Sequence, residues 1–403
     1  MSPSTAPPRV LVLDQNNSLP SDRRVWAEIT ALRGAGYEVA AICPKGDGRD
    51  LDAHEQIDGV DIHRFDQDPA SGAIGYLREY ATALWRMRAL VRRISRGRPF
   101  DVVHACNPPD LLLLTALSQR RRGARFVFDH HDLAPELYLV RFGRGEDLLY
   151  RLSLLVERIN FRLADVVLAT NESYRRVATG RGRKRPEDVF IVRSAPALER
   201  FTPVEPRESL RRGKPHLLAY IGIMARQDGV DHALRGLAAL REQRDDWHAV
   251  FAGEGSAVEE MQELARELGI ADLVEFPGWL EQDEVRALLG TADVCLVPDP
   301  KTPLSDASTL VKVAEYLAMS RPVVAYDLTE TRVTAGDAAV YATAGDDRSF
   351  GEQIAALLDD PERRARMGAE GRARVEQGLA WEHSERELLA AYEHVLRGRS
   401  ATP

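Results

Sequence analysis

The most informative stretch of this chain is SDASTLVKVAEYLAMSRPVV, residues 305–324. It predicts a loop of small and hydroxyl residues, then a helix that carries Lys312 and Glu315 three residues apart, then a β-branched strand. Backbone amides at a helix N-terminus bind anions, and Lys312 adds positive charge one turn in. Glu315 can accept hydrogen bonds from a diol, so the pattern suits the pyrophosphate and ribose of a nucleotide. An amphipathic helix with a solvated ion pair between these two residues explains the spacing equally well.

Length and composition place the chain among ordinary globular proteins. Its 403 residues exceed what one core usually supports, so two domains are expected. No window approaches ~18 uninterrupted apolar residues, so no transmembrane helix is predicted. The three cysteines, Cys43, Cys106 and Cys295, are odd in number and widely spaced. They fit reduced thiols rather than a disulfide framework or a zinc site, and with no signal pattern at the N-terminus we expect a cytoplasmic protein.

The net charge of −8 is distributed unevenly. Residues 1–200 hold 31 Lys and Arg against 26 Asp and Glu, whereas the remaining residues hold 23 against 36. The acidic second half argues against general nucleic-acid binding, and the basic first half fits an anionic lipid surface or an anionic acceptor.

Short apolar runs alternate with helical patterns in both halves, which predicts parallel sheets built from βαβ units. The predicted strands are Val10–Leu13, Val39–Ile42, Val102–His104, Phe126–Phe128, Val166–Ala169, Val189–Val192, Leu217–Ile221, His248–Ala252, Val274–Phe276, Val294–Val297 and Val323–Ala325. The most distinct predicted helices are Arg23–Ala35, Tyr76–Arg96, Val230–Gln243, Ala257–Leu268, Asp283–Leu289 and Leu310–Met319.

We therefore predict an α/β fold of two doubly wound, Rossmann-like domains, residues 1–195 and 207–377, facing one another across a cleft. The proline-rich residues 196–206 are the predicted linker. Residues 378–403 are predicted to form a last helix that packs back toward the first domain. Ligands of such domains bind at the carboxyl ends of the strands.

Two glycine turns follow predicted strands of the second half. Gly222 opens the segment GIMARQDGVD, and Gly253 lies in the segment FAGEG. Such turns can present backbone amides to phosphate, although a βα loop that binds no ligand has the same sequence pattern. Arg226 strengthens the phosphate interpretation, because a guanidinium contacts phosphate with two hydrogen bonds.

In the first half, the strand at Phe126–Phe128 runs into DHHDLAPE, which begins at Asp129. A metal would need three or four convergent ligands, and the sequence neighbours His130 and His131 point apart, so a metal site is disfavoured. His131 is predicted either to contact a sugar near the reacting centre or to be a structural histidine. Asn107 also follows a strand, but the prolines after it favour a structural turn there.

Taken together, these motifs resemble the retaining glycosyltransferases of family 4, which have the GT-B fold and use nucleotide-sugar donors. The branch that is most similar includes bacterial surface-polysaccharide and secondary-metabolite sugar transferases. The resemblance covers nearly the whole chain and is carried by Asp22–Val25, Asp129–Leu133, Gly222–Asp231, Asp299–Pro300 and Lys312–Tyr316.

The resemblance implies a donor site in the second domain. Glu315 matches the second glutamate of the family's E-x7-E signature and would bind the donor ribose. The amides around Ser308, Thr309 and Leu310 would hold the pyrophosphate, with Arg226 or Lys312 neutralising it. Gly222 and Gly253 complete the implied donor-binding set.

It also implies roles in the first domain. His131, with Asp132 beside it, would lie near the transferred sugar and help to stabilise developing charge. Asp22, Arg24 and Asn107 would lie on the acceptor side. The nucleotide-sugar is a substrate, so no cofactor is implied, and no metal is expected because no Asp-x-Asp pair follows a strand. Uridine is the preferred nucleoside of the donor, as UDP, because family members commonly use it.

The chain departs from the family pattern in three places. Ala307 stands where the first glutamate of E-x7-E is expected, and Asp306 is one residue away. Asp228 stands near the position of the family's usual lysine, whose charge either Lys312 or Arg226 could replace. Asn16–Ser18 occupies the place of the usual glycine pair after the first strand.

The acceptor is left open as a hydroxyl of a glycan, a lipid-linked acceptor or a small molecule. Residues Tyr76–Arg98 contain seven arginines among apolar and aromatic side chains. They fit a helix that lies on the inner face of an anionic membrane, but a packed surface helix with solvated arginines fits slightly better. A nucleotide-sugar epimerase of the same fold and a non-catalytic nucleotide-sugar-binding partner are the alternative functions.

Overall fold

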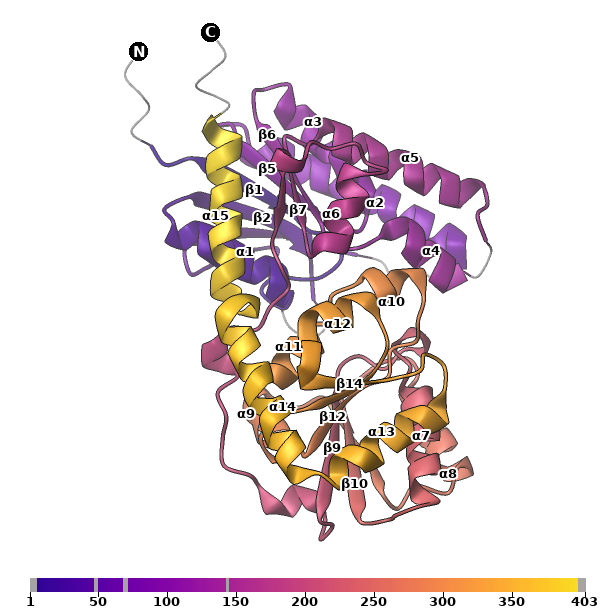
Figure 1. Cartoon of the computed structure of the whole chain (residues 1–403). Helices are drawn as coiled ribbons and strands as arrows, with labels where there is room; N and C mark the ends of the chain where they lie inside the picture. The colour runs from indigo at the N-terminus through magenta and orange to yellow at the C-terminus, as the bar shows by residue number, and fades with distance from the viewer. Residues whose placement is uncertain (1–5, 47–49, 68–71, 143–144, 398–403) are drawn as a thin grey trace. The chain divides into compact units, whose positions relative to one another are not determined.

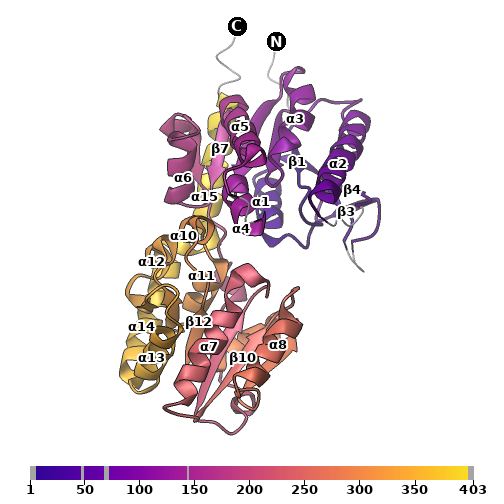
Figure 2. The same ribbon diagram turned by 90° about the vertical axis from the view of Figure 1, so that its right-hand side faces the viewer.

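The computed structural model describes residues 6–46, 50–67, 72–142 and 145–397. The chain forms two compact units, of which the first comprises residues 1–193 and 384–403 and the second residues 194–383. Each unit is a sheet with helices on both faces (Figure 1), and the view in Figure 2 shows the same layers from the side. The predicted α/β class with two Rossmann-like units is confirmed.

The first unit contains an eight-stranded sheet in the order β3-β4-β2-β1-β5-β6-β7-β8. Its strands are β1 (Arg9–Leu13), β2 (Glu38–Pro44), β3 (His54–Ile57), β4 (Val60–Phe65), β5 (Val102–Cys106), β6 (Arg125–His130), β7 (Val166–Ala169) and β8 (Val189–Ile191). Its helices are α1 (Arg23–Gly34), α2 (Gly72–Ile94), α3 (Leu113–Arg120), α4 (Ala134–Phe142), α5 (Leu148–Leu163) and α6 (Glu172–Thr179).

The β3–β4 hairpin is absent from the sequence prediction. Both strands carry several polar residues. β3 is the edge strand and is partly exposed, whereas β4, between β3 and β2, is mostly buried. β3 is also the antiparallel strand of an otherwise parallel sheet. The turn is formed by Asp58 and Gly59, both with positive φ, which is the two-residue hairpin turn that an Asp-Gly pair favours.

The second unit contains a six-stranded parallel sheet in the order β11-β10-β9-β12-β13-β14. Its strands are β9 (His216–Ile221), β10 (Trp247–Ala252), β11 (Val274–Gly278), β12 (Val294–Val297), β13 (Val323–Tyr326) and β14 (Ala339–Ala342). Its helices are α7 (Val230–Arg241), α8 (Val258–Glu267), α9 (Gln282–Thr291), α10 (Pro303–Ala307), α11 (Val311–Ala318), α12 (Thr329–Ala335), α13 (Asp347–Leu358) and α14 (Pro361–Arg374).

Both faces of the second sheet are buried, which explains why its strands read as continuous apolar runs. On β9, Leu218 and Tyr220 enter the apolar cluster on one face, and Leu217, Ala219 and Ile221 enter the cluster on the other. Parallel strands aligned in this way bring the loops after β9, β10 and β12 to the same edge of the sheet.

Residues 196–206, the predicted linker, are packed as part of the second unit. Phe201 is buried in an apolar cluster of that unit, and its carbonyl accepts a hydrogen bond from Arg372. The last helix, α15 (Trp381–Arg397), belongs to the first unit from Ser384 onward. There the Tyr392 hydroxyl contacts His104 Nδ1 at 2.9 Å.

Helix α2 packs its apolar face against the first unit. Leu84, Met87 and Val91 are buried, whereas Trp85 is 72% exposed. The side chains of Tyr76 and Leu77, which the sequence analysis includes in a membrane-facing helix, lie outside the described residues. Among the helices of the described ranges, none is both long and apolar enough to span a bilayer.

Candidate active site

The first unit places His131 directly after β6, above the buried carboxylate of Asp129. That carboxylate has no solvent exposure and accepts a hydrogen bond from His131 Nδ1 at 2.8 Å. It also accepts from Arg24 Nη2 at 2.7 Å. The His131 side chain is 14% exposed, and its Nε2 has no hydrogen-bond partner among the described residues. The imidazole is therefore held through one nitrogen and can donate from the other.

Charge in this cluster favours an imidazolium. Burial lowers the pKa of His131, but the charge and hydrogen bond of Asp129 outweigh it and raise the pKa to about 9. Burial opposes ionisation of Asp129, yet Arg24 and His131 hold the pKa of that carboxyl well below its usual range. His131 is consequently protonated at neutral pH.

Asn107 positions the loop that carries His131. Its Oδ1 accepts from the backbone amides of His131 and Asp132, at 2.9 and 3.0 Å. Its Nδ2 donates to the Asp132 carbonyl at 2.8 Å and to Asp110 at 2.9 Å. Because Asn107 is 1% exposed and its amide is engaged, it supports the His131 loop from beneath, and its place on the acceptor side stays a prediction.

Arg24 likewise belongs to the buried network. Its guanidinium pairs with Asp129 and with Glu28 at 3.0 Å, and it donates to the Val192 carbonyl at 2.9 Å. With its side chain 10% exposed, it joins α1 to the ends of β6 and β8 and does not face an acceptor. Asp22 caps α1 by accepting from the Val25 amide at 3.0 Å, and its acceptor role stays a prediction.

Asp132 stands beside His131 on the same loop. Burial raises the pKa of its carboxyl, although the nearby His131 charge opposes this. No hydrogen bond to that carboxylate is present among the described residues. Asp132 is half-buried, so a catalytic role for it also stays a prediction.

Two clusters contain side chains that could ligate a metal. One consists of Glu28, His104, Cys106 and Asp129, all buried. The Arg24 guanidinium already lies between the two carboxylates, and burial raises the pKa of the Cys106 thiol well above its ordinary value. This cluster therefore suits the arginine better than a metal ion.

The other cluster consists of His54, Asp61 and His63 on the β3–β4 hairpin. Asp61 contacts His63 Nε2 at 3.1 Å, and the two imidazole rings stack. Strands β2, β1 and β5 separate this hairpin from β6 and His131.

In the second unit, Lys312 lies in the first turn of α11, and its side chain is only 12% exposed. Its Nζ pairs with Asp299 Oδ2 at 2.9 Å and lies 4.6 Å from the centre of the Tyr220 ring. Burial lowers the pKa of Lys312, but Asp299 and Tyr220 outweigh it and raise the pKa above its ordinary value. The alternative of a solvated ion pair on this helix is therefore wrong for Lys312.

The loop before α11 is shorter than predicted, because Ser305, Asp306 and Ala307 belong to helix α10 and only residues 308–310 join it to α11. Leu310 is the N-cap with extended backbone, and the first amides of such a helix have no partner inside the helix. Ser308 Oγ donates to the Leu304 carbonyl at 2.7 Å. Tyr316 anchors the helix, because its hydroxyl accepts from the Ile221 amide at the end of β9. Glu315, one turn after Lys312, is half-buried.

Asp306 does not replace the carboxylate that is missing at Ala307. Its two oxygens accept from the amide and hydroxyl of Thr329, at 2.8 and 2.9 Å, at the start of α12. The carboxylate is thus used to join α10 to α12.

Arg226 is separate from Lys312. Its side chain is 82% exposed and pairs with Glu260 of α8 at 3.1 Å. With Arg235 and Glu260 it lines a hollow of about 570 Å³ beside α7 and α8. The structure therefore makes Lys312 rather than Arg226 the cation at the start of α11.

The glycines of the two predicted turns pack against each other. Gly222 and Gly253 have φ of 145° and 139°, and a Cβ on Gly253 would lie 1.9 Å from the Gly222 carbonyl oxygen. The Gly253 amide donates to the Gly278 carbonyl at 2.8 Å. The close approach that requires these glycines is between two protein loops, and contact of either with a donor stays a prediction.

This packing predicts different losses of stability for alanine substitutions at two glycines that both have positive φ. Gly253→Ala should destabilise the second unit by on the order of 3 kcal/mol or more, since the new methyl clashes with backbone. Gly213→Ala is the control, because Gly213 also has positive φ but no atom within 4 Å of an added Cβ. It should cost about 1–2 kcal/mol. Equal losses in urea denaturation would contradict the close loop contact.

The raised pKa of His131 predicts a pH dependence. Its interactions stabilise the first unit fully below the ordinary pKa of 6.5, and this contribution is lost as the pH rises through about 9. Over that range, the free energy of unfolding of wild type should fall by about 3 kcal/mol more than that of His131→Gln. Denaturation curves at several pH values measure this difference, with His383→Gln as the control. Parallel curves for wild type and His131→Gln would rule the imidazolium out.

Two family models match the chain. The model described as glycosyl transferase 4-like domain matches residues 21–194, and the one described as glycosyl transferases group 1 matches residues 202–374. Each therefore covers most of one structural unit.

Curated relatives are named as sugar transferases. A D-inositol 3-phosphate glycosyltransferase of Thermobifida fusca is 31% identical over 268 residues, 63% of this chain and 58% of the relative. An MMP alpha-(1->4)-mannosyltransferase of Mycolicibacterium hassiacum is 29% identical over 215 residues, 52% of this chain and 49% of the relative. The alignments thus span about half the length of these two relatives.

Solved structures share the fold over nearly the whole chain. Sucrose-phosphate synthase of Thermosynechococcus elongatus has a TM-score of 0.82 at 18% identity, covering 97% of this chain and 100% of that one. HepE of Anabaena, solved in complex with UDP-glucose, has a TM-score of 0.69 at 14% identity, covering 98% of this chain and 100% of that one. The chain therefore belongs to the family 4-like glycosyltransferases and has the GT-B fold.

Proposed function

We propose that the protein transfers a sugar from a nucleoside-diphosphate-sugar to an acceptor hydroxyl, with retention of anomeric configuration. The observation that carries the proposal is the largely enclosed, charged Lys312 in the first turn of α11. An ammonium has three N–H donors, and Asp299 and the Tyr220 hydroxyl take two of them. The third is available for a phosphate oxygen, next to the first amides of α11.

This arrangement suits a diphosphate leaving group. Breaking the bond to the anomeric carbon develops negative charge on the β-phosphate, and fixed amides with a lysine stabilise that charge without rearranging. The Ser308–Leu310 segment and Lys312 would hold the diphosphate, and Glu315 would accept hydrogen bonds from the ribose hydroxyls. Ala307 has no side-chain oxygen to hold donor-sugar hydroxyls, so the sugar is contacted by other groups.

On the sugar, the same bond cleavage develops positive charge at the ring. We assign His131 the role of a donor to the transferred sugar: Nδ1 is committed to Asp129, and Nε2–H is available to a hydroxyl oxygen. The acceptor hydroxyl would attack on the face that the diphosphate leaves, and a phosphate oxygen would take its proton. This route requires neither a protein nucleophile nor a metal.

UDP is the nucleotide to test first, since HepE, a neighbour in fold, was solved with UDP and with UDP-glucose. The acceptor is a hydroxyl of a glycan, a lipid-linked acceptor or a small molecule, and the proposed location is the cytoplasm or the inner membrane surface. Curated relatives named for inositol phosphate and for MMP make small polar acceptors the first choice for screening.

The donor site predicts a selective loss of nucleotide affinity. Lys312→Gln should weaken binding of UDP by about tenfold to a hundredfold, because it removes a charge-assisted hydrogen bond to phosphate. The control is Lys214→Gln, which lies just before the start of β9, at the opposite end of the strand from the phosphate-facing loops. Isothermal titration calorimetry measures both. If Lys312→Gln binds UDP as tightly as Lys214→Gln, the diphosphate is held elsewhere.

The catalytic role predicts the converse behaviour. His131→Ala should bind UDP with near wild-type affinity and reduce the rate of UDP release from a UDP-sugar by about a hundredfold or more. The release assay uses a panel of UDP-sugars, with and without small-molecule acceptors. Full turnover in His131→Ala would contradict the assignment. A product that is an isomerised UDP-sugar, with no UDP released, would instead identify an epimerase.

A further inference from the structure

Helix α5 of the first unit presents an apolar stripe to solvent. Leu148, Leu152, Leu155 and Ile159 are 79%, 50%, 53% and 38% exposed. Their spacing of four, three and four residues places them on one face of the helix. Exposed leucines are ordinary one at a time, but a continuous row of them on one helix marks an interaction surface.

The opposite face of α5 holds the helix in the first unit. Glu157, Asn160 and Phe161 are buried there. Asn160 donates to the Asp110 carbonyl at 2.8 Å, and the Phe161 ring packs against Phe128. The apolar stripe is therefore not needed to attach α5 to the fold.

A row of arginines flanks the stripe. Arg151, Arg158 and Arg162 are exposed and lie along one side of it. The single acidic residue of α5, Glu157, is on the buried face and pairs with Arg181 at 2.7 Å. The exposed surface of α5 is thus apolar and cationic, with no carboxylate of its own.

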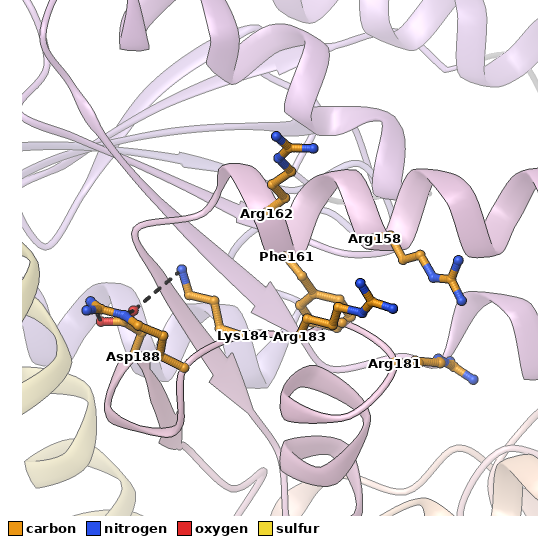
Figure 3. Close-up of a pocket in the computed structure, with 9 residues that line it drawn as sticks. Arg158, Phe161, Arg162, Arg181, Arg183, Lys184 and Asp188 are labelled. Atoms are coloured by element: carbon orange, nitrogen blue, oxygen red, sulfur yellow. Dashed lines mark hydrogen bonds and ion pairs between the residues drawn. The ribbon is translucent and has the colours of Figure 1, made fainter.

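The cationic row continues into a hollow of about 510 Å³ between α5 and the loop after α6. Figure 3 shows Arg158 and Arg162 extending from α5, with Arg183 and Lys184 on that loop. Gly182 is required there, because a Cβ would lie 2.4 Å from the Phe161 ring. The hollow therefore has an aromatic floor and basic walls.

The arginines of this hollow are unequal in their pairing. Arg181 is committed to Glu136 and Glu157. By contrast, no carboxylate among the described residues pairs with Arg158, Arg162 or Arg183. These three guanidinium groups can therefore bind an external anion.

We propose that α5 docks on a bilayer that contains anionic phospholipid. The stripe of Leu148, Leu152, Leu155 and Ile159 enters the interfacial region, and Arg158, Arg162 and Arg183 bind lipid phosphates. Apolar burial and attraction to anionic headgroups together are what hold an amphipathic helix in a membrane surface. The attachment requires neither donor nor transfer, and it narrows the proposed location from cytoplasm or membrane to the membrane surface.

Charge argues against the other occupants of this face. A second copy of the chain, related by a two-fold axis, would present the same arginine row to this one, and like charges would oppose the contact. The predicted membrane helix, α2, is less suitable because it buries Leu84, Met87 and Val91 in the first unit. Attachment is therefore assigned to α5.

Vesicle flotation of the full chain tests the proposal. At low salt, wild type should float with vesicles that contain phosphatidylglycerol. With vesicles of phosphatidylcholine alone, it should remain unbound in the bottom fraction. Arg158→Gln/Arg162→Gln/Arg183→Gln should weaken partitioning by on the order of a hundredfold, at about fivefold for each charge. Leu152→Ser/Leu155→Ser/Ile159→Ser should weaken it by at least about tenfold. All substituted side chains are exposed, so thermal denaturation should show unchanged folding.

The matched control is Trp85→Ser/Arg88→Gln/Arg92→Gln on α2, which should float like wild type. Failure of wild type to float with phosphatidylglycerol would overturn the proposal. So would loss of flotation in the α2 variant but not in the α5 variants. A wild-type dimer that the leucine substitutions dissociate, without flotation, would make the face an interface between copies.

Discussion

The ion pairs of one buried carboxylate, Asp129, organise the first unit. Arg24 reaches it from α1 and also donates to the carbonyl of the residue after β8, so one side chain joins three segments of the fold. His131 takes the remaining side of the same carboxylate. A buried charge of this kind is costly unless paired, and removing either cation would leave the carboxylate under the candidate active site with only one of its two positive partners. The position and the protonation of His131 therefore depend on the same interaction.

The second unit uses a similar principle. The Lys312 side chain has little contact with solvent, yet it stays charged because Asp299 and the face of Tyr220 compensate for lost hydration. In both units a cation is thus fixed in place before any ligand arrives. Such preorganised charges are most useful in a reaction that separates charge, because they do not have to reorient as the bond breaks. Cleavage of a nucleotide-sugar is a reaction of this type.

The sequence predicted most strands of both sheets because their apolar runs are continuous, but it missed β3, β4 and β14 and did not predict how the charges pair. Asp129 and Arg24 are 105 residues apart, and no local pattern relates them. The support that Arg24 and Asn107 give His131 from within was consequently missed. The Asp58–Gly59 turn is a local signal that predicts the missed β3–β4 hairpin. Periodicity identified α2 as amphipathic but could not say that its apolar face points inward.

The proposed chemistry depends on a protonated His131 held by Asp129, and NMR titration of His131 measures that protonation directly. The imidazole signals of His131, assigned by comparison with His131→Gln, would be followed through neutral and alkaline pH. We expect an imidazolium that persists through neutral pH and titrates near 9, with Nδ1–H bonded to Asp129. A His131 that titrates near its ordinary value of 6.5 would contradict it.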